Sequence, residues 1–565
     1  MYSFAYTLFM NIDAIEKGYY EVIVDGVKVS QHTKPLKAIA RAQEEKAKNQ
    51  DAYIYVKQPN IEPVVEIDES AEIQQLKDDY DMIWAELERF KAMDGGTVVD
   101  PPIDPPITEL LAFPTAKGAG AYTTGGRGGE VVHVTNLNAT GAGSLKEALS
   151  MTVKRTIVFD VSGDINIEPL LYLDATNSDF YLAGQSAPTG GVTIGNGRVY
   201  FSGASNYRIR HMRFKGGYAA DLVPNSGDGI GSNSFNSVKN IQDIIVDHCS
   251  FGFGYTMPVW VDQGDNDLLA QDITIQNCLF SETDKGVIIG KDVDGQSAYR
   301  TIGSLSFLKN IFYNTQYRVP NTTGNHENNT DDSIEVINNL SWQTTGRISR
   351  GAGNQNLNHI GNASYGGSVP LRDTGVNLWS SGWTPKIHTS GNLLVYPNVA
   401  SEDLTSTIAQ MNADNTLSWK DFNAGVEPEY GDQLPANFFV AQYPFRGVAP
   451  TVLDSSVLRT TLPNDNGCNA RLNEDGSVST NLDTYDADYL GNILADTMVA
   501  PIDKSSYSLG TITPASRPAG FYVSNPHIPE AYLIAKGLPQ TPTVHTELNE
   551  AGYTRLEEYL YQIDL

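Results

Sequence analysis

The sequence has few cysteines and no long apolar run, and these absences exclude several classes of protein. Only three cysteines occur among 565 residues, Cys249, Cys278 and Cys468. So few cysteines exclude a disulfide framework, and their spacing does not resemble a zinc site. No stretch approaches the roughly 20 apolar residues of a membrane span. The first residues lack the basic and apolar segments of an export signal, so we expect no signal peptide.

Positive charge is also scarce. The chain has 39 lysines and arginines against 67 acidic residues, a formal net charge of −28. A nucleic-acid-binding protein needs a basic surface to displace counterions, so this charge argues against that class. The net negative charge of the chain would not attract an acidic glycan either. Any anionic ligand should therefore be held by a local basic patch.

The residues that are abundant indicate a β-rich protein. The chain has 51 glycines, and 40% of its residues are hydrophobic, which is enough for a folded core. Many glycines together with asparagine, serine and threonine predict short strands separated by turns. A chain of this length should form two or three folding units.

Residues 1–66 are predicted to form a small α/β module that attaches the protein to a larger assembly. Residues 4–12 and 19–29 have the pattern of strands, with a tight turn at Asp25 and Gly26 inside the second stretch. A helix is expected over 35–42, because Pro35 suits the first helical turn. Residues 52–56 alternate as a further strand.

Residues 67–93 contain a heptad pattern, and residues 94–111 form a proline-rich linker. Six apolar residues fall on one a/d seam: Ile73, Leu76, Tyr80, Ile83, Leu87 and Phe90. The seam could pack on the first module, or it could self-associate as a short coiled-coil stalk, which we expect to be a homotrimer. The proline pairs at 101–102 and 105–106 favour a stiff, extended linker.

From residue 112 onward a loose repeat predicts a solenoid. Its markers recur at intervals of 23 to 37 residues, each after a strand-like run: His211, His248, Asn277, Asn310, Asn339, Asn362 and Asn392. Three residues after all but the last of them stands an aromatic residue. Stacked polar side chains would satisfy backbone groups at a turn, and the aromatics would stack in the core. The repeat predicts a right-handed parallel β-helix over 112–450, with a C-terminal extension over 451–565 packed on or after it.

Several motifs of this region resemble polysaccharide lyase family 1, the pectate lyases. They are AFPTAKGAGAYTTGGRGG at 112–129, VTNLN at 134–138, GSLKEAL at 143–149, TIVFDVSG at 156–163, AGQ at 183–185, VDHCS at 246–250 and GYTRLEEYL at 552–560. The resemblance covers roughly 112–565 and says nothing about residues 1–111. It implies a parallel β-helix that cleaves a uronic-acid chain by β-elimination.

The resemblance assigns two catalytic residues. Arg318 stands eight residues after Asn310, as the family's base arginine does. Lys285, five residues before Gly290, matches the family lysine that contacts the substrate carboxylate. Both should project from neighbouring coils onto one outer face, although each could instead be an ordinary surface cation.

The calcium site implied by the family is largely missing. Asp228 matches a ligand position, but Thr256, Met257 and Trp260 stand where acidic ligands are expected. One carboxylate does not make a site for an ion that prefers six or more oxygen ligands. The resemblance therefore implies calcium as a cofactor, but the residues at three of its ligand positions do not support it. Three further carboxylates could rebuild a site or form a solvated loop: Asp262, Asp265 and Asp267.

Other residues could bind sugar or support the fold. Trp260 could stack on a sugar ring or fill the core, and Arg347 and Arg350, one coil beyond Arg318, could extend a groove. In the family's second arginine position stands Thr323. We expect His248 to be a structural hydrogen-bonding residue, and Cys249 and Cys278 to be buried thiols.

Three functions fit these observations. The first is a bacteriophage tail spike in the virion tail, bound through 1–66 to tail proteins, which recognises and cleaves a host surface polysaccharide. The second is a free, secreted bacterial pectate or uronate lyase. The third is a glycan-binding adhesin that has lost catalysis. The tail-spike hypothesis depends on the arrangement of module, heptad segment, linker and lyase-like region.

Overall fold

The structure of this chain is a computed structural model, which describes residues 20–24, 27–32, 54–57 and 110–565. The last range has gaps at 168–169, 217–232, 238–240, 255–257, 264–268, 291–300, 317, 324–331, 345–349, 353–354, 367–373, 378–384, 396–406, 422–436 and 504–511. The chain divides into two compact units, Met1–Thr108 and Glu109–Leu565. Within the described residues no helix has the length and hydropathy to cross a bilayer.

The first unit contains a small antiparallel sheet. Its order is β2-β1-β3, from β1 (Tyr20–Val24), β2 (Val27–His32) and β3 (Ile54–Lys57). β1 and β2 form a hairpin in which Val24 pairs with Val27, so its turn lies at the predicted position. The predicted strand over 4–12, the helix over 35–42, the heptad segment 67–93 and most of the linker 94–111 lie outside the described residues.

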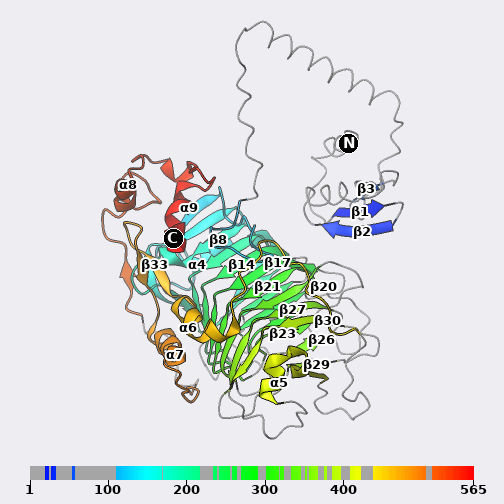
Figure 1. Cartoon of the computed structure of the whole chain (residues 1–565). Coiled ribbons are helices and arrows are strands. Elements are labelled where there is room, and N and C mark those ends of the chain that lie inside the picture. The colour runs from blue at the N-terminus through cyan, green and yellow to red at the C-terminus, as the bar shows by residue number, and fades with distance from the viewer. Residues whose placement is uncertain are drawn as a thin grey trace, which may run out of the picture. The chain divides into compact units, whose positions relative to one another are not determined.

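The second unit is a parallel β-helix, as predicted, built from three long parallel sheets (Figure 1). Sheet 1 contains β4 (Glu130–Val134), β5 (Arg155–Phe159), β8 (Phe180–Ala183), β11 (Tyr207–Arg210), β14 (Ile241–Asp247), β17 (Leu269–Gln276), β21 (Leu305–Leu308), β24 (Ile334–Ile337), β27 (Asn356–Ile360) and β30 (Lys386–Ser390), and β20 (Thr301–Ile302) pairs with β17.

Sheets 2 and 3 complete each coil. Sheet 2 contains β6 (Val161–Asn166), β9 (Val192–Gly195), β12 (Arg213–Lys215), β15 (Ser250–Gly252), β18 (Leu279–Ser281), β22 (Ile311–Tyr313), β25 (Leu340–Thr344), β28 (Ala363–Gly366) and β31 (Leu393–Val395). Sheet 3 contains β7 (Leu170–Asp174), β10 (Arg198–Ser202), β13 (Asn233–Ser237), β16 (Val259–Gln263), β19 (Ile288–Ile289), β23 (Asn321–Thr323), β26 (Arg350–Ala352), β29 (Thr374–Asn377) and β32 (Trp419–Asp421).

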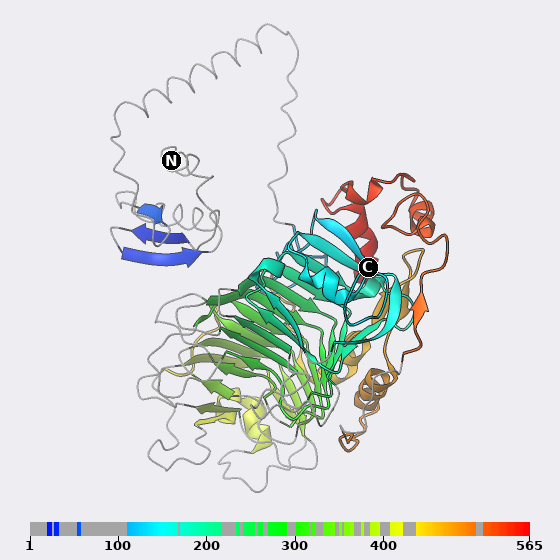
Figure 2. The ribbon, with the colours of Figure 1, turned by 180° about the vertical axis from the view of Figure 1, so that it is seen from behind.

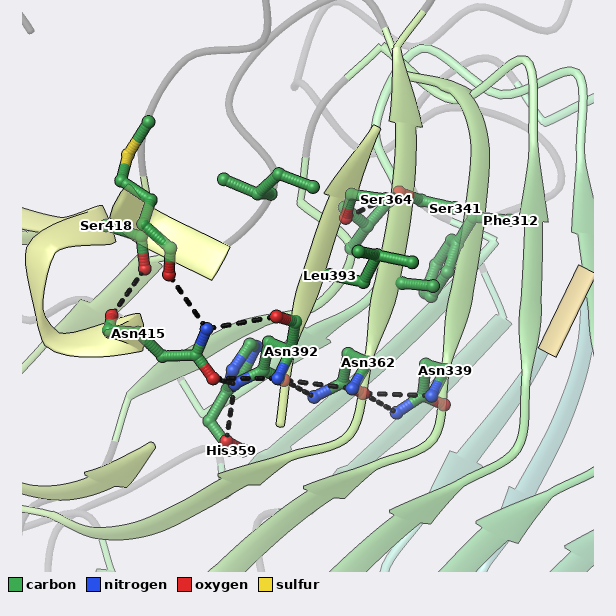
Figure 3. A pocket seen from close by; sticks show the side chains of 14 residues that line it. Phe312, Asn339, Ser341, His359, Asn362, Ser364, Asn392, Leu393, Asn415 and Ser418 are labelled. Carbon is green, nitrogen blue, oxygen red and sulfur yellow. Dashed lines mark hydrogen bonds between the residues drawn. The ribbon is translucent and has the colours of Figure 1, made fainter. Parts of the chain in front are cut away.

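An asparagine ladder closes the turn between sheets 1 and 2 in the later coils (Figure 3). The Oδ1 of Asn339 accepts a hydrogen bond from the backbone N–H of Asn310 at 2.9 Å, and its Nδ2 donates to the carbonyl of Phe307 at 3.0 Å. The same pattern continues through Asn362, Asn392 and Asn415. These side chains satisfy backbone groups that would otherwise be buried without partners, which is why the turn requires asparagine.

The predicted register of the early coils was wrong by one residue. The N–H of Leu279 donates to Cys249 and the N–H of Ile311 donates to Cys278, so the ladder position before Asn310 belongs to the cysteines. His211, His248 and Asn277 align with one another but stand at the preceding corner, in line with Lys309. Both cysteines are fully buried, as expected.

This one-residue shift of register changes which aromatic residues occupy the core. Inside the helix Phe280 stacks between Phe251 and Phe312, with ring centroids 5.2 and 5.0 Å away. Tyr313 and Trp342, which the sequence placed in this stack, point to the opposite face of sheet 2. A shift of one residue in a strand moves its side chains to the other face.

Removing one ladder side chain should destabilise the β-helix. An Asn339→Ala variant leaves the N–H of Asn310 and the carbonyl of Phe307 buried without that partner. An unsatisfied buried group costs about 1–3 kcal/mol. We expect urea unfolding to give a free energy lower by about 2 kcal/mol. The exposed Asn464→Ala variant should leave it within about 0.5 kcal/mol; equal losses in both variants would contradict a role for the ladder.

The remaining chain runs along one side of the β-helix (Figures 1 and 2). The elements of this C-terminal extension are α6 (Leu458–Thr461), β33 (Ala470–Leu472), β34 (Val478–Thr480), α7 (Thr484–Leu494), β35 (Ala515–Ser516), α8 (Glu530–Lys536) and α9 (Arg555–Leu560). Two short helices, α4 (Leu145–Ser150) and α5 (Ile408–Ala413), lie between strands of the β-helix instead. Leu458 and Tyr489 pack on Tyr313 and Trp342, and β35 pairs antiparallel with β6. The extension thereby covers the outer face of sheet 2.

Buried ion pairs attach the extension to β11 and β12. Four cations of these strands, each no more than 1% exposed, meet acidic residues of the extension: Arg208 meets Glu557 at 3.0 Å, Arg210 meets Asp564 at 2.6 Å, Arg213 meets Asp483 at 3.7 Å, and Lys215 meets Asp486 at 2.5 Å. A buried charge without a partner is very unfavourable. The β-helix and the extension should therefore fold as one unit.

Candidate functional site

The outer face of sheet 3 carries Trp260, which the sequence predicted as a candidate sugar-binding residue. Strand alternation turns Val259 and Val261 into the core and leaves Trp260 partly exposed. Register pairing places Trp260 beside Ile288, Ile288 beside Asn321, and Asn321 beside Arg350. We call this line of paired residues the sheet 3 column.

Lys285 and Arg318 precede neighbouring members of this column. Lys285 lies three residues before Ile288, and Arg318 lies three residues before its partner Asn321. The two turns stack directly, because the N–H of Val287 donates to the carbonyl of Arg318 at 2.8 Å. Both side chains are partly exposed. The structure therefore brings the two cations onto adjacent coils beside one sheet.

Close packing holds the Arg318 turn in place. Arg318 has a left-handed backbone, with φ of 70°. A Cβ on Gly286 would lie 2.0 Å from the Arg318 carbonyl oxygen, so only glycine permits this approach. Positive φ also occurs at other coil corners, such as His248 and Asn277. The conformation positions Arg318 but does not by itself mark a functional residue.

The other predicted site residues are only partly described. Arg350 begins β26, one coil beyond Asn321, as expected. Arg347, Asp228, Thr256 and Met257 lie outside the described residues. Arg347 nevertheless stands three residues before Arg350, the same offset that Arg318 has from Asn321. Lys285, Arg318 and Arg347 thus hold equivalent sequence positions before β19, β23 and β26.

Of the positions at which the resemblance implies calcium ligands, the structure describes Trp260 alone. Trp260, in β16, offers an indole where an oxygen ligand would be needed. Asp262 also lies in β16, whereas Asp265 and Asp267 lie outside the described residues. Among the residues that the structure describes, one group has metal-ligand spacing, and it lies elsewhere: His211, Asp247 and His248. No calcium-dependent step is derived for this site.

That group is a structural network, which agrees with the expected role of His248. Asp247 accepts from Arg210 Nε at 2.7 Å and lies 2.8 Å from His248 Nδ1. Its other carboxylate oxygen accepts from Gln276 and Asn277. Burial alone would raise the pKa of Asp247, but His248 and Arg210 hold it far below its usual range. With both oxygens in use, Asp247 has no free position for a metal.

His248 should make the fold more stable in its charged form. Burial lowers its pKa, but Asp247 and then Asp465 outweigh that effect and raise it to about 10. A raised pKa means that this stabilisation is complete below pH about 6.5 and is lost as the pH rises through about 10. A His248→Gln variant should therefore be less stable than the parent at pH 6.5. A tenfold change in proton affinity on folding corresponds to about 1.4 kcal/mol of stability.

Urea titrations at pH 6.5, 8 and 9.5 measure the difference in unfolding free energy between the parent and His248→Gln. This difference should decrease steadily as the pH rises. His388→Gln provides the control, since this half-buried histidine of β30 lies within hydrogen-bond distance of the Val440 carbonyl and the Ser390 hydroxyl, which are both uncharged. A constant difference across pH would show that His248 is not the titrating group.

An internal cavity lies apart from this face, at the C-terminal end of the asparagine ladder (Figure 3). Its volume is about 30 Å³, and its lining includes Asn362, Asn392 and His359. Such a space holds about one or two water molecules rather than a sugar. Burial lowers the pKa of His359 to about 4, so this imidazole is neutral at pH 7. The cavity belongs to the core.

Part of the chain is similar in sequence to proteins named pectate lyase or pectin lyase. No family model matches the chain. It is 32% identical over 220 residues to "Probable pectate lyase C" of Emericella nidulans, covering 39% of this chain and 47% of that protein. It is 30% identical over 222 residues to "Pectin lyase" of Pectobacterium carotovorum, covering 38% of this chain and 63% of that protein. The chain thus spans about half the length of the first of these curated relatives.

The similarity of this chain to solved structures is weaker. The thermostable pectate lyase PL 47 superposes with a TM-score of 0.39 at 15% identity, over 64% of this chain and 98% of that one. The cedar pollen allergen jun a 1 superposes with a TM-score of 0.37 at 17% identity, over 62% of this chain and 92% of that one. The fold assignment therefore rests on the strand pairing of this chain itself.

Two further aromatic residues lie on the sheet 3 column. Tyr172 in β7 pairs with Tyr200 in β10, and Tyr200 pairs with Ser234, the neighbour of Trp260. Neither tyrosine was among the site residues predicted from the sequence. Strand alternation, with Leu171 and Leu173 buried on either side of Tyr172, is the signal that could have shown one of them facing outward.

Proposed function

We propose that the β-helix is a polysaccharide lyase that cleaves a uronic-acid-containing glycan by β-elimination. The observation that carries this proposal is the stacking of the Lys285 and Arg318 turns on adjacent coils beside sheet 3. The two positions match the lysine and the base arginine of the pectate lyases that the sequence resembles. The partial identity to "Probable pectate lyase C" supports the same substrate class.

In this reaction a base removes the proton at C5, and the electron pair forms a C4–C5 double bond as the C4–O bond breaks. The departing oxygen then takes a proton from water. Arg318 serves as the base in the proposal. A guanidinium ordinarily has a pKa above 12, so nearby positive charge must favour its neutral form. Lys285 would supply such charge, and it would also neutralise the substrate carboxylate as negative charge develops there.

The proposal does not require calcium. The described face provides Trp260 where the family carries acidic ligands, so neutralisation rests on cations of the chain. Arg347 and Arg350 follow Arg318 along the sequence and would add positive charge one coil beyond it. Elimination should therefore persist in EDTA.

We further infer a bacteriophage tail-spike context. In this arrangement residues 1–66 bind virion tail proteins, residues 67–93 form a trimeric stalk, and the β-helix meets a polysaccharide of the host surface. The heptad seam and the proline-rich linker support this arrangement. A sedimentation run should give a trimer of the 61.6 kDa chain; a monomer at all concentrations would overturn the stalk and leave a free, secreted uronate lyase as the alternative.

A glycan-binding adhesin is the second candidate, and Trp260 favours it. An indole on the outer face of a sheet suits stacking on a sugar ring, which needs no catalysis. An adhesin would bind the glycan without producing new chain ends.

The test combines binding with product formation. The full chain is incubated with polygalacturonate and with extracted bacterial capsule, with calcium or with EDTA, and ultraviolet absorbance follows 4,5-unsaturated products. A rise in absorbance with either glycan supports the lyase. Binding with no rise, and with no new reducing ends, would replace the lyase by the adhesin.

A further inference from the structure

Tyr172 and Tyr200 form an aromatic pair on the surface of the first coils. Their rings stack with centroids 5.6 Å apart and planes 13° apart. Tyr172 is 50% exposed and Tyr200 is partly exposed, whereas Leu171, Leu173, Val199 and Phe201 beside them are buried in the core. A half-exposed stacked pair is not explained by core packing, since its neighbours already fill the interior.

The pair lies in line with the candidate site. Tyr172, Tyr200, Ser234, Trp260, Ile288 and Asn321 follow one another through successive parallel pairings. Neighbouring strands are about 4.8 Å apart, so five steps place Tyr172 about 24 Å from Asn321, beside the Arg318 turn. This length exceeds that of a short oligosaccharide and suits an extended glycan chain.

We propose that Tyr172 and Tyr200 form a distal sugar-binding subsite for the glycan that reaches Lys285 and Arg318. The flat apolar faces of pyranose rings stack on aromatic side chains, and this contact does not depend on the charge of the sugar. A subsite of this kind suits a protein with a net charge of −28, because it adds affinity for an acidic chain without added cations. The inference rests on the proposed function for its ligand class.

The subsite should affect long glycans only. A Tyr172→Ala variant should weaken retardation by polygalacturonate in affinity electrophoresis about fivefold to tenfold, whereas Tyr172→Phe should retain most of it. On polygalacturonate the Tyr172→Ala variant should raise KM by a similar factor and leave kcat unchanged. On trigalacturonate its kcat/KM should equal that of the parent, because a trimer cannot span both sites.

Leu548→Ala is the matched control, since Leu548 is an exposed apolar residue of the C-terminal extension, 64% accessible. Its retardation should equal that of the parent. Because Tyr172 is exposed, the thermal unfolding midpoints of all variants should agree, which separates binding from folding.

The outcomes distinguish this inference from the proposed lyase. Retardation that depends on Tyr172, without any unsaturated product, would support the subsite and overturn the elimination proposal. Elimination that proceeds equally well in Tyr172→Ala, with unchanged retardation, would overturn the subsite alone. A parent chain that is not retarded by polygalacturonate at all would also overturn the subsite, whatever the elimination assay gives.

Discussion

A Glu557→Ala variant is expected to lose about 3–5 kcal/mol of unfolding free energy, the cost of leaving a buried charge without its partner. Glu557 in α9 is 2% exposed, and it binds Arg208 at 3.0 Å and Arg127 at 2.9 Å. It also completes the capping box of α9 with Thr554. Alanine would leave the fully buried guanidinium of Arg208 with uncharged partners, namely the Ala112 and Gly125 carbonyls, the Tyr561 hydroxyl and the Tyr181 ring.

Glu558→Ala is the control for this prediction, because the two residues are neighbours in the same helix. Glu558 is 23% exposed in its side chain and pairs with Arg555 three residues earlier. A surface pair of this kind contributes less than about 1 kcal/mol. Urea unfolding followed by tryptophan fluorescence compares the two variants. Similar losses in both would show that the buried network does not hold the extension.

Acid should weaken the same contact. Burial raises the pKa of Glu557, but Arg208 and Arg127 outweigh this effect and lower it below the usual range. A lowered pKa gives stability that is present above the unfolded value of about 4.3 and is lost as the pH falls through the folded value. The difference in unfolding free energy between the parent and Glu557→Ala should therefore decrease below pH about 4.

An Arg318→Ala variant is expected to release unsaturated product at least a hundredfold more slowly, because removal of a positioned base typically costs 10²–10⁴ in rate. Binding of polygalacturonate should fall by only a few-fold, since Lys285 and the aromatic residues of the column remain. Alanine and arginine are both non-glycine residues at the same φ of 70°, so the backbone strain does not change. Initial rates of absorbance change, with affinity electrophoresis of the same samples, provide the two readouts.

Lys536→Ala removes an exposed cation of α8, in the C-terminal extension, and should leave the rate unchanged. A parent-like rate in Arg318→Ala would remove Arg318 from the mechanism. A loss of rate equal to the loss of binding would assign Arg318 to substrate binding instead of proton removal.

The β-helix itself could be predicted from local sequence features. Short β-rich runs alternate with polar corners at intervals close to one coil, and asparagine recurs where a turn needs its amide. Lys285 and Arg318 could be placed on neighbouring coils for the same reason, because each follows a marker of the repeat at a known distance. Their catalytic roles come from the family resemblance and stay predictions.

The register of the early coils could not be predicted, because the sequence contains two overlapping alignments. Matching Asn277 to Asn310 aligns Phe280 with Tyr313, whereas matching Cys278 to Asn310 aligns Phe280 with Phe312. The folded protein uses the second, since burying stacked phenylalanines removes far more apolar surface from water than one amide contact can offset. Cys278 then occupies the ladder position, and its N–H is still satisfied by Asn310.

By itself the sequence determined the period of the solenoid, the kind of residue at its corners and the β1–β2 hairpin, because these depend on contacts within a few residues or on the repeat length. Only the tertiary structure decided that Arg208, Arg210, Arg213 and Lys215 are buried under acidic residues from beyond residue 480. The alignment of Tyr172, Tyr200 and Trp260 on one column was decided there too. Pairing between distant segments depends on how whole surfaces fit together, and local patterns carry no information about that fit.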